Sequence, residues 1–172
     1  MFITKADAFY YMTPQKVLLK TNMGDITLEL REDMPITAGN FAKLVGEGFY
    51  NGVIFHRVID GFMAQGGDPT GTGMGGSGRN IKGEFSENGF VQNTLSHTRG
   101  VVSMARSQDP DSASSQFFIC YSDDCTFLDG NYAAFGKVIE GMENVDKIAA
   151  SEVDEDGKIQ TPVGIEKVKV NT

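Results

Sequence analysis

The stretch FHRVIDGFMAQGGD, residues 55–68, is the most informative part of the sequence. Residues 55–59 and residues 63–65 are two short runs rich in apolar side chains. Asp60-Gly61, a dipeptide typical of tight turns, separates them. The stretch therefore predicts two short β-strands joined by a turn, followed by a glycine-rich segment at residues 66–78.

Strand alternation sorts the side chains of this hairpin. Successive side chains of a strand point to opposite faces, so Met63 and Gln65 should share a face, and Arg57 should face opposite to His56. One interpretation is purely structural, with the apolar residues in a core and the arginine in a surface pair. The other is a site in which an arginine and a glutamine lie beside apolar side chains and a glycine-rich loop.

Outside this stretch, the chain contains many short β-rich runs and only two helical ones. Apolar alternation around Gly24 predicts a hairpin over residues 16–30. Helical spacing predicts one helix that starts at Pro35 and ends near Gly46, and a second over residues 142–149. Further strands are expected at residues 53–59, 63–65, 101–105, 116–120, 132–138 and 165–170. Because an open sheet would leave edges to protect, this pattern favours a mainly β fold, a closed antiparallel barrel with two helices.

The composition fits one globular domain. The chain has 172 residues, 40% hydrophobic and 22% charged, and its 21 glycines against 5 prolines indicate many tight turns. We expect a single domain at residues 14–172, preceded by an N-terminal extension at residues 1–13. Phe2 and Phe9 to Tyr11 make this extension too apolar for a free tail, so we expect it to pack on the barrel.

Charge and hydropathy exclude two classes of partner. The formal net charge of -8 gives no support for binding a phosphate backbone, so no nucleic acid partner is expected. No stretch approaches the roughly 18 apolar residues of a membrane span, and Lys5 and Asp7 interrupt the place of a signal peptide. We therefore expect a cytoplasmic protein in which Cys120 and Cys125 are reduced thiols. A monomer is expected, although no sequence feature decides the oligomeric state.

Two further motifs resemble known sites only in part. Residues 71–76 match the pattern G-x-G-x-x-G, but residues 77–80 do not start a helix, so a mobile loop at the rim of a site is favoured over nucleotide binding. The acidic residues between positions 140 and 156 predict a solvated helix face followed by a loop. A calcium site at residues 154–157 is disfavoured, because the later Glu of a calcium loop is missing.

Metal and nucleophilic chemistry also lack a motif. The histidines and cysteines do not have the spacing of a zinc site; they are His56, His97, Cys120 and Cys125. Alternation in residues 116–120 places Gln116, Phe118 and Cys120 on one face and Phe117 and Ile119 on the other, which suggests that Cys120 has a packing role. The chain contains no G-x-S-x-G pattern of a serine hydrolase.

Five motifs together resemble the cyclophilin family of peptidyl-prolyl isomerases. They are residues 55–68, Val102-Ser-Met-Ala105, Ser115-Gln-Phe-Phe-Ile-Cys120, Phe127-Leu-Asp-Gly130 and Phe135-Gly-Lys-Val138. The similarity runs from about Lys16 to Val170, and the first motif is long and has no gap. The resemblance implies a closed eight-stranded antiparallel β-barrel capped by two α-helices, in agreement with the pattern above.

The resemblance also implies a proline pocket on the outer barrel face, with no metal and no cofactor. Arg57 would be the catalytic donor. The apolar wall would consist of Phe62, Met63, Phe118 and Leu128, and the peptide would be held by Gln65 and by the backbone at Ala105 and Arg106. Gln116 is also expected to contact substrate. The expected partners are X-Pro segments of peptides and unfolded proteins.

Three positions depart from the best-known pattern of the family. Phe127 stands where tryptophan is often found, Tyr132 where histidine is, and Arg106 where asparagine is. We expect the first two to line the pocket. Because Phe127 has no indole N–H, the resemblance implies that the cyclic peptide cyclosporin binds more weakly.

Two other functions remain open from the sequence. A binding module or chaperone-like clamp could hold X-Pro segments without turning them, using the same apolar residues. A barrel that carries a small apolar ligand inside is the weaker alternative, because closed barrels of about eight strands are often filled by side chains.

Overall fold

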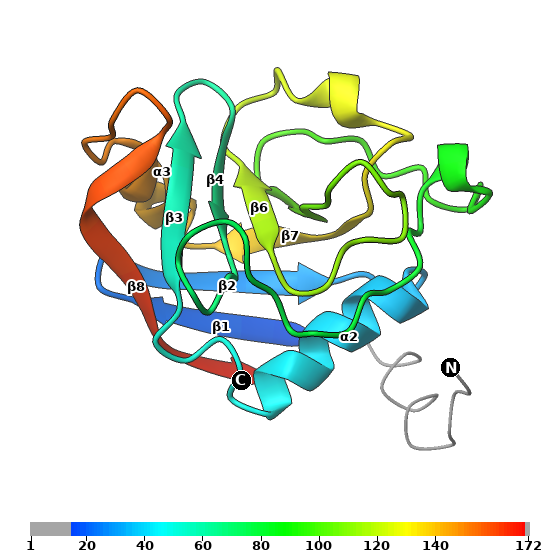
Figure 1. Cartoon of the computed structure of the whole chain (residues 1–172), viewed down its shortest axis with the longest axis horizontal. Helices are drawn as coiled ribbons and strands as arrows, with labels where there is room; N and C mark the ends of the chain where they lie inside the picture. The colour runs from blue at the N-terminus through cyan, green and yellow to red at the C-terminus, as the bar shows by residue number, and fades with distance from the viewer. Residues whose placement is uncertain (1–14, 171–172) are drawn as a thin grey trace.

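The computed structural model describes residues 15–170, with side chains described at residues 15–159 and 163–165. Eight antiparallel strands close into a barrel in the order β1-β2-β7-β5-β6-β4-β3-β8 (Figure 1). The strands are β1 Lys16–Thr21, β2 Gly24–Leu30, β3 Ile54–Ile59, β4 Met63–Gly66, β5 Val101–Met104, β6 Phe117–Cys120, β7 Ala134–Glu140 and β8 Lys158–Val170. The predicted mainly β barrel is confirmed, whereas the proposed extension at residues 1–13 lies outside the described residues.

The two predicted helices are present as α2, Pro35–Gly46, and α3, Met142–Ala149. Both contribute buried apolar side chains to the barrel core, among them Phe41 from α2 and Ile148 from α3. No side chain at the N-cap of α2 bonds the first turn. The Glu84 carboxylate does so from a distant segment, accepting hydrogen bonds from the Thr37 N–H at 2.5 Å and the Thr37 hydroxyl at 2.7 Å.

Aromatic side chains fill the core where the barrel meets α2. The Phe117 ring packs edge-on against Phe41 at 5.4 Å and Tyr50 at 5.6 Å between centroids. Burial raises the pKa of Tyr50, whose hydroxyl donates to the Ser115 carbonyl at 2.9 Å. Side chains thus occupy the barrel interior, as expected for a barrel of this size, and the proposed interior ligand gains no support.

Strand β8 begins at Lys158, well before the predicted start at Ile165. Ile159 and Val163 have the same alternation as Ile165, but Pro162 and Gly164 interrupt the run, and both residue types are disfavoured inside a strand. The segment is a strand because it pairs with β3, as Ile54 with Gly164 and Arg57 with Lys158, before it pairs with β1. The structure therefore corrects the predicted boundary.

A register shift between Phe55 and Arg57 bends strand β3. Unbroken alternation would put these two side chains on the same face. With the irregularity, Phe55 is fully buried in the core, whereas Arg57 is exposed. His56 is buried beneath the glycine-rich loop, where a Cβ on Gly73 would lie 3.5 Å from its Nε2. Arg57 and His56 do differ as predicted, because Arg57 is exposed and His56 is buried. The irregularity of β3 contributes to this difference in addition to strand alternation.

Candidate active site

Three adjacent strands bring an arginine, a glutamine and a phenylalanine to one level of the barrel. Arg57 on β3 is paired with Gln65 on β4, and Gln65 is paired with Phe118 on β6. Side chains of directly paired residues lie on the same face of a sheet, and neighbouring strands are about 4.8 Å apart. These three side chains therefore form a row on the outer face, away from the core.

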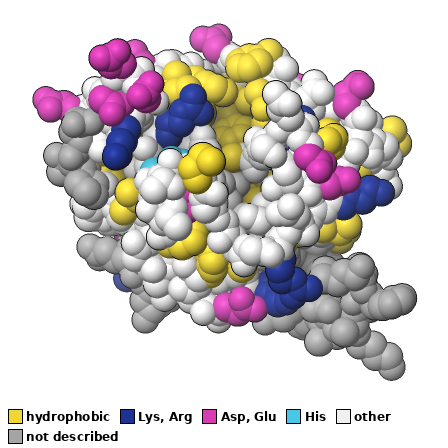
Figure 2. All heavy atoms as spheres, viewed as in Figure 1, with side chains coloured by type: hydrophobic (Ala, Val, Ile, Leu, Met, Phe, Trp, Pro, Cys, Tyr) yellow, Lys and Arg dark blue, Asp and Glu magenta, His cyan; other side chains and the backbone are white. Residues whose placement is uncertain are grey.

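An apolar patch covers this outer face beside the row. Its buried members are Met63, Phe118, Cys120, Cys125 and Leu128, and its partly buried members are Ile59, Phe62, Ala105 and Tyr132. Alternation in β6 is as predicted, because Phe117 and Ile119 belong to the barrel core instead. Figure 2 shows hydrophobic side chains gathered in a hollow on one face of the molecule.

Aromatic rings form the walls of the apolar patch. The Tyr132 ring packs edge-on against Phe118 at 6.0 Å, and Phe62 lies 6.5 Å from Phe118. Phe127, on the short helix η2 (Thr126–Leu128), packs against Phe62 at 5.5 Å but is 67% exposed. A ring this exposed is free to contact a bound peptide on one face.

A buried hydrogen-bonded network lies behind Phe118 and was not recognised as part of the site in the sequence. The His97 ring stacks on Phe118 at 6.1 Å, and its Nε2 and Nδ1 lie 2.8 Å from the Ser103 Oγ and the Asp129 carboxylate. Asp129 also accepts from the His97 backbone N–H at 2.7 Å. His97 and Ser103 are fully buried, so the Ser103 hydroxyl is out of reach of a substrate, and this Ser-His-Asp arrangement supports Phe118 rather than hydrolysis.

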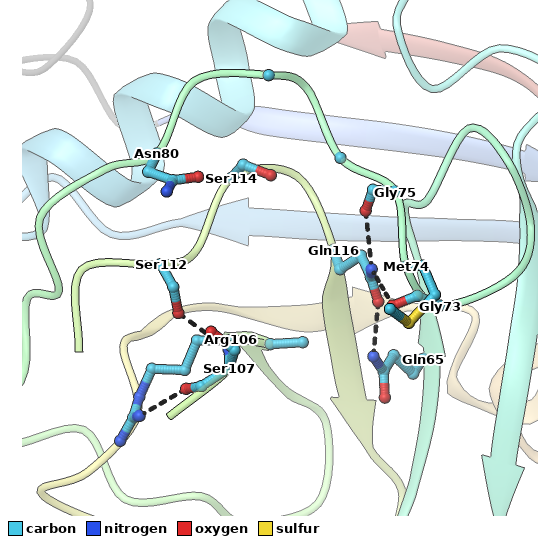
Figure 3. A pocket seen from close by; sticks show the side chains of 13 residues that line it. Gln65, Gly73, Met74, Gly75, Asn80, Arg106, Ser107, Ser112, Ser114 and Gln116 are labelled. Carbon is cyan, nitrogen blue, oxygen red and sulfur yellow. Dashed lines mark hydrogen bonds between the residues drawn. The ribbon is translucent and has the colours of Figure 1, made fainter. Parts of the chain in front are cut away.

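A polar pocket adjoins the apolar patch at Ala105 (Figure 3). It has a volume of about 490 Å³ and is lined by Gln65, Gly73, Met74, Gly75, Gly76, Gly78, Asn80, Ala105, Arg106, Ser107, Ser112, Ser114 and Gln116. The Gln65 amide donates to Gln116 at 2.8 Å, and the Gln116 amide donates to the carbonyls of Gly73 and Gly75, both at 2.9 Å. This chain of bonds fixes both glutamines at the junction of patch and pocket.

The carboxylate of Asp68 organises the glycine-rich loop. It accepts from the backbone N–H groups of Thr70, Thr72, Gly73 and Gly75 at 2.6–3.1 Å. Burial would raise the pKa of Asp68, but the hydrogen bonds from Gly75, Thr70 and Gly73 dominate and hold it well below its usual range. Because these donors are already used by Asp68, they are not free to bind a phosphate. The loop lines the polar pocket, and its mobility stays a prediction.

The guanidinium of Arg57 is the positively charged group in the row of Arg57, Gln65 and Phe118, and it is free to bind a ligand. Its side chain is exposed, and it makes no hydrogen bond or ion pair with any residue that the structure describes. Its stem lies against the chain at Gly157, where a Cβ would approach the Arg57 Cγ at 3.5 Å. The donors of Arg57 can therefore point to a bound ligand without breaking an existing bond.

The two cysteines belong to the packing of the apolar patch. Both are free thiols and fully buried, and Cys125 donates a weak hydrogen bond to the Phe62 carbonyl at 3.3 Å. Burial raises the pKa of the Cys120 thiol, so it stays protonated at neutral pH. Within the described residues, no group of three or more potential ligands could hold a metal ion, and no helix has the length and apolar character to cross a bilayer.

We predict a nearly flat activity profile between about pH 6 and pH 8. Burial lowers the pKa of both His97 and His56, so each is neutral through most of this window and protonates only in acid. The check is kcat/KM for one peptide across the window, with the fold followed by circular dichroism at each pH. A bell-shaped profile with an intact fold would point to acid-base chemistry through a histidine instead.

Comparison with known proteins defines the class. Residues 16–170 match the family described as cyclophilin type peptidyl-prolyl cis-trans isomerase/CLD. A probable peptidyl-prolyl cis-trans isomerase of Brucella suis is 46% identical over 167 residues, covering 90% of this chain and 81% of the relative. The chain thus belongs to the cyclophilin family, and it is an enzyme of the peptidyl-prolyl cis-trans isomerase type.

Two solved structures share the fold. A cyclophilin type peptidyl-prolyl cis-trans isomerase of Cryptosporidium parvum superposes with a TM-score of 0.84 at 36% identity, covering 93% of this chain and 99% of the other. A crystal structure of that isomerase in the presence of the dipeptide Ala-Pro superposes with a TM-score of 0.82 at 37% identity, covering 91% and 99%.

The structure brings all the site residues expected from the sequence to one outer face. Arg57 and Gln65 belong to the row, and Phe62, Met63, Phe118, Leu128 and Tyr132 belong to the apolar patch, with Phe127 at its edge. Ala105, Arg106 and Gln116 line the polar pocket. The residues missed by sequence reasoning, His97, Ser103 and Asp129, support this face from behind.

Proposed function

We propose that Arg57 catalyses rotation about X-Pro peptide bonds by binding the twisted amide. Rotation costs about 18 to 20 kcal/mol because the amide loses resonance in the twisted state. In that state the prolyl nitrogen becomes pyramidal and offers a lone pair as a hydrogen-bond acceptor. A guanidinium donor beside this nitrogen binds the transition state better than either ground state, and no covalent bond or proton transfer is needed.

The apolar patch and the polar pocket have separate roles in this proposal. The proline ring lies on Phe118 and Met63, where it is held still while the acyl side turns. Gln65 and the backbone at Ala105 and Arg106 hold the rest of the peptide. Removal of water from the amide also favours the less polar twisted state.

The observation that carries the proposal is Arg57, which makes no bond with the described residues, in register with Gln65 and Phe118. The Cryptosporidium isomerase crystallised in the presence of Ala-Pro supports the choice of X-Pro peptides as substrate. Unfolded proteins expose such segments, so we propose that the chain assists protein folding, and we place it in the cytoplasm.

The rival function is an X-Pro binding module with little catalysis. An isomerase at a concentration far below that of an Ala-Pro peptide accelerates its cis-trans relaxation, whereas a binding module shifts populations only in proportion to its own amount. A protease-coupled or spectroscopic assay at substoichiometric protein separates the two. Acceleration without a changed equilibrium supports catalysis, and binding without acceleration supports the module.

Replacement of Phe127 by tryptophan should tighten cyclosporin inhibition. We propose that cyclosporin occupies the apolar patch, and that Phe127 keeps a ring there but lacks a donor. One neutral hydrogen bond contributes about 0.5 to 1.5 kcal/mol net, so Phe127→Trp should strengthen inhibition by roughly 2 to 13-fold if the larger ring fits. Paired titrations of both proteins, with turnover of one Ala-Pro peptide as the internal control, measure this.

Turnover should change much less than inhibition, because Arg57 and Phe118 are untouched. Equal inhibition of both proteins would mean that residue 127 does not line the inhibitor site, or that the Tyr132 hydroxyl already supplies the donor.

A further inference from the structure

The side chain of Arg106 ties together two segments that border the site. It follows strand β5, and its Nε and Nη2 donate to the Asn131 carbonyl at 3.1 and 2.7 Å. Its Nη1 donates to the Ser107 carbonyl at 2.9 Å (Figure 3). The same nitrogen donates to the Gln108 carbonyl at 3.3 Å. The segment before β7 and the segment after β5 are therefore joined through one planar group.

The same guanidinium also lies over two aromatic rings. Its central carbon lies 5.0 Å from the Phe85 ring centroid and 4.8 Å from the Tyr132 ring centroid. Phe85 is only 2% exposed, belongs to the barrel core and packs so closely on Gly83 that no side chain would fit there. Arg106 thus contacts both a fixed core ring and the Tyr132 ring, and Tyr132 in turn packs on Phe118.

These contacts leave little of the guanidinium for a ligand. An arginine has five N–H donors, and four hydrogen bonds are already made, all to neutral carbonyls. Within the described residues, Arg106 forms no ion pair with a carboxylate. Its role is therefore one of geometry rather than of charge recognition.

We propose that Arg106 is a positioning residue that fixes the Tyr132 ring and the Ala105–Arg106 backbone for peptide binding. The inference rests on the proposed site, but it assigns a role to the side chain rather than to the backbone. A planar fork is required, because lysine carries a single point charge and cannot bond both segments while also contacting both rings. The asparagine that is often found at this position in the family is too short to do so.

The test compares Arg106→Met and Arg106→Lys with wild type on one Ala-Pro peptide. Contacts that bind ground and transition states equally affect KM and leave kcat unchanged. We expect Arg106→Met to raise KM by about three to tenfold with kcat within about twofold, and Arg106→Lys to restore less than half of the loss. Arg99→Met is the matched control, because Arg99 also joins two segments, through Asp146 and the Tyr121 carbonyl, but does not line the site.

A double-mutant cycle shows whether Arg106 acts through Tyr132. In a Tyr132→Leu background, Arg106→Met should raise KM by less than about twofold. An unchanged KM in Arg106→Met, full rescue by lysine, or independent effects of the two substitutions would overturn the inference. Absence of activity in the wild type would overturn the proposed function, whereas an active wild type with a loss only in Arg57→Ala would overturn the role of Arg106 alone.

Discussion

Replacing Arg57 by alanine is expected to lower kcat/KM by at least about 10 to 150-fold, because a hydrogen bond from a charged donor contributes roughly 1.5 to 3 kcal/mol. The fold should persist, since the exposed guanidinium makes no bond with the described part of the chain. Steady-state assays with one Ala-Pro peptide and circular dichroism of both proteins measure the two outcomes.

Arg31→Ala provides the control for loss of a surface arginine. Arg31 is exposed and pairs locally with Asp33 at 2.8 Å, away from the site, so its loss should leave kcat/KM unchanged. A loss below about threefold in Arg57→Ala, with an intact spectrum, would reject the catalytic assignment. If affinity and isomerisation were both unchanged, a binding module would be the better description.

Among the substitutions proposed here, Asp68→Ala should cause the largest decrease in the free energy of unfolding. The carboxylate is fully buried and accepts from four backbone N–H groups of the loop, which would lose their common partner. An unsatisfied buried group costs about 1 to 3 kcal/mol, and exposed parts of this loop can recover water, so we expect a loss of about 2 to 4 kcal/mol. Urea unfolding followed by circular dichroism measures it.

The same substitution should weaken peptide binding. Gln116 donates to the carbonyls of Gly73 and Gly75, which the Asp68 carboxylate holds in place. Loss of this anchor should displace both Gln116 and Gln65, which is bonded to it. Because these side chains hold the peptide, KM should rise more than kcat falls. Equal urea midpoints for wild type and Asp68→Ala would contradict the anchoring role.

Asp68 also gives the stability a defined dependence on pH. Its pKa is lower in the folded than in the unfolded chain, so its stabilising effect is complete above about pH 5 and is lost as the pH falls through the ordinary carboxyl range and below. Asp68→Asn, which keeps the shape but removes the charge, should be less stable at neutral pH. The difference between the two proteins should shrink in acid.

Local patterns were sufficient to predict most of the fold. Alternation in residues 116–120 separated Phe117 and Ile119, which lie in the core, from Phe118 and Cys120, which lie in the patch. Pro35 indicated the first turn of α2, and the glycines at positions 46 and 48 indicated its end, which lies at Gly46. These signals concern neighbouring residues, so a single sequence carries them.

Features that depend on distant residues could not be predicted in this way. The bond between Glu84 and the first turn of α2 joins residues 47 positions apart, and the Asp129–His97 bond joins residues 32 apart. Strand β8 starts at Lys158, where it pairs with β3, although Pro162 in this segment argues against a strand. Each of these contacts exists only once the barrel has closed.

The candidate site likewise combines features that local sequence motifs predict with features that depend on distant residues. The residue types were given by contiguous motifs, but the row of Arg57, Gln65 and Phe118 depends on the pairing of three strands and on the irregularity of β3. The role of the Arg106 side chain was hidden, because the family pattern has asparagine there and its partners come from three segments of the chain.

Catalysis by Arg57 is measured without interference from binding by the rate at which an enzyme-bound Ala-Pro peptide interconverts between cis and trans. NMR exchange measurements at saturating peptide separate this rate from the bound population, in wild type and in Arg57→Ala. We expect the bound rate to fall at least about tenfold in Arg57→Ala while the bound population changes little. Equal bound rates in the two proteins would contradict it.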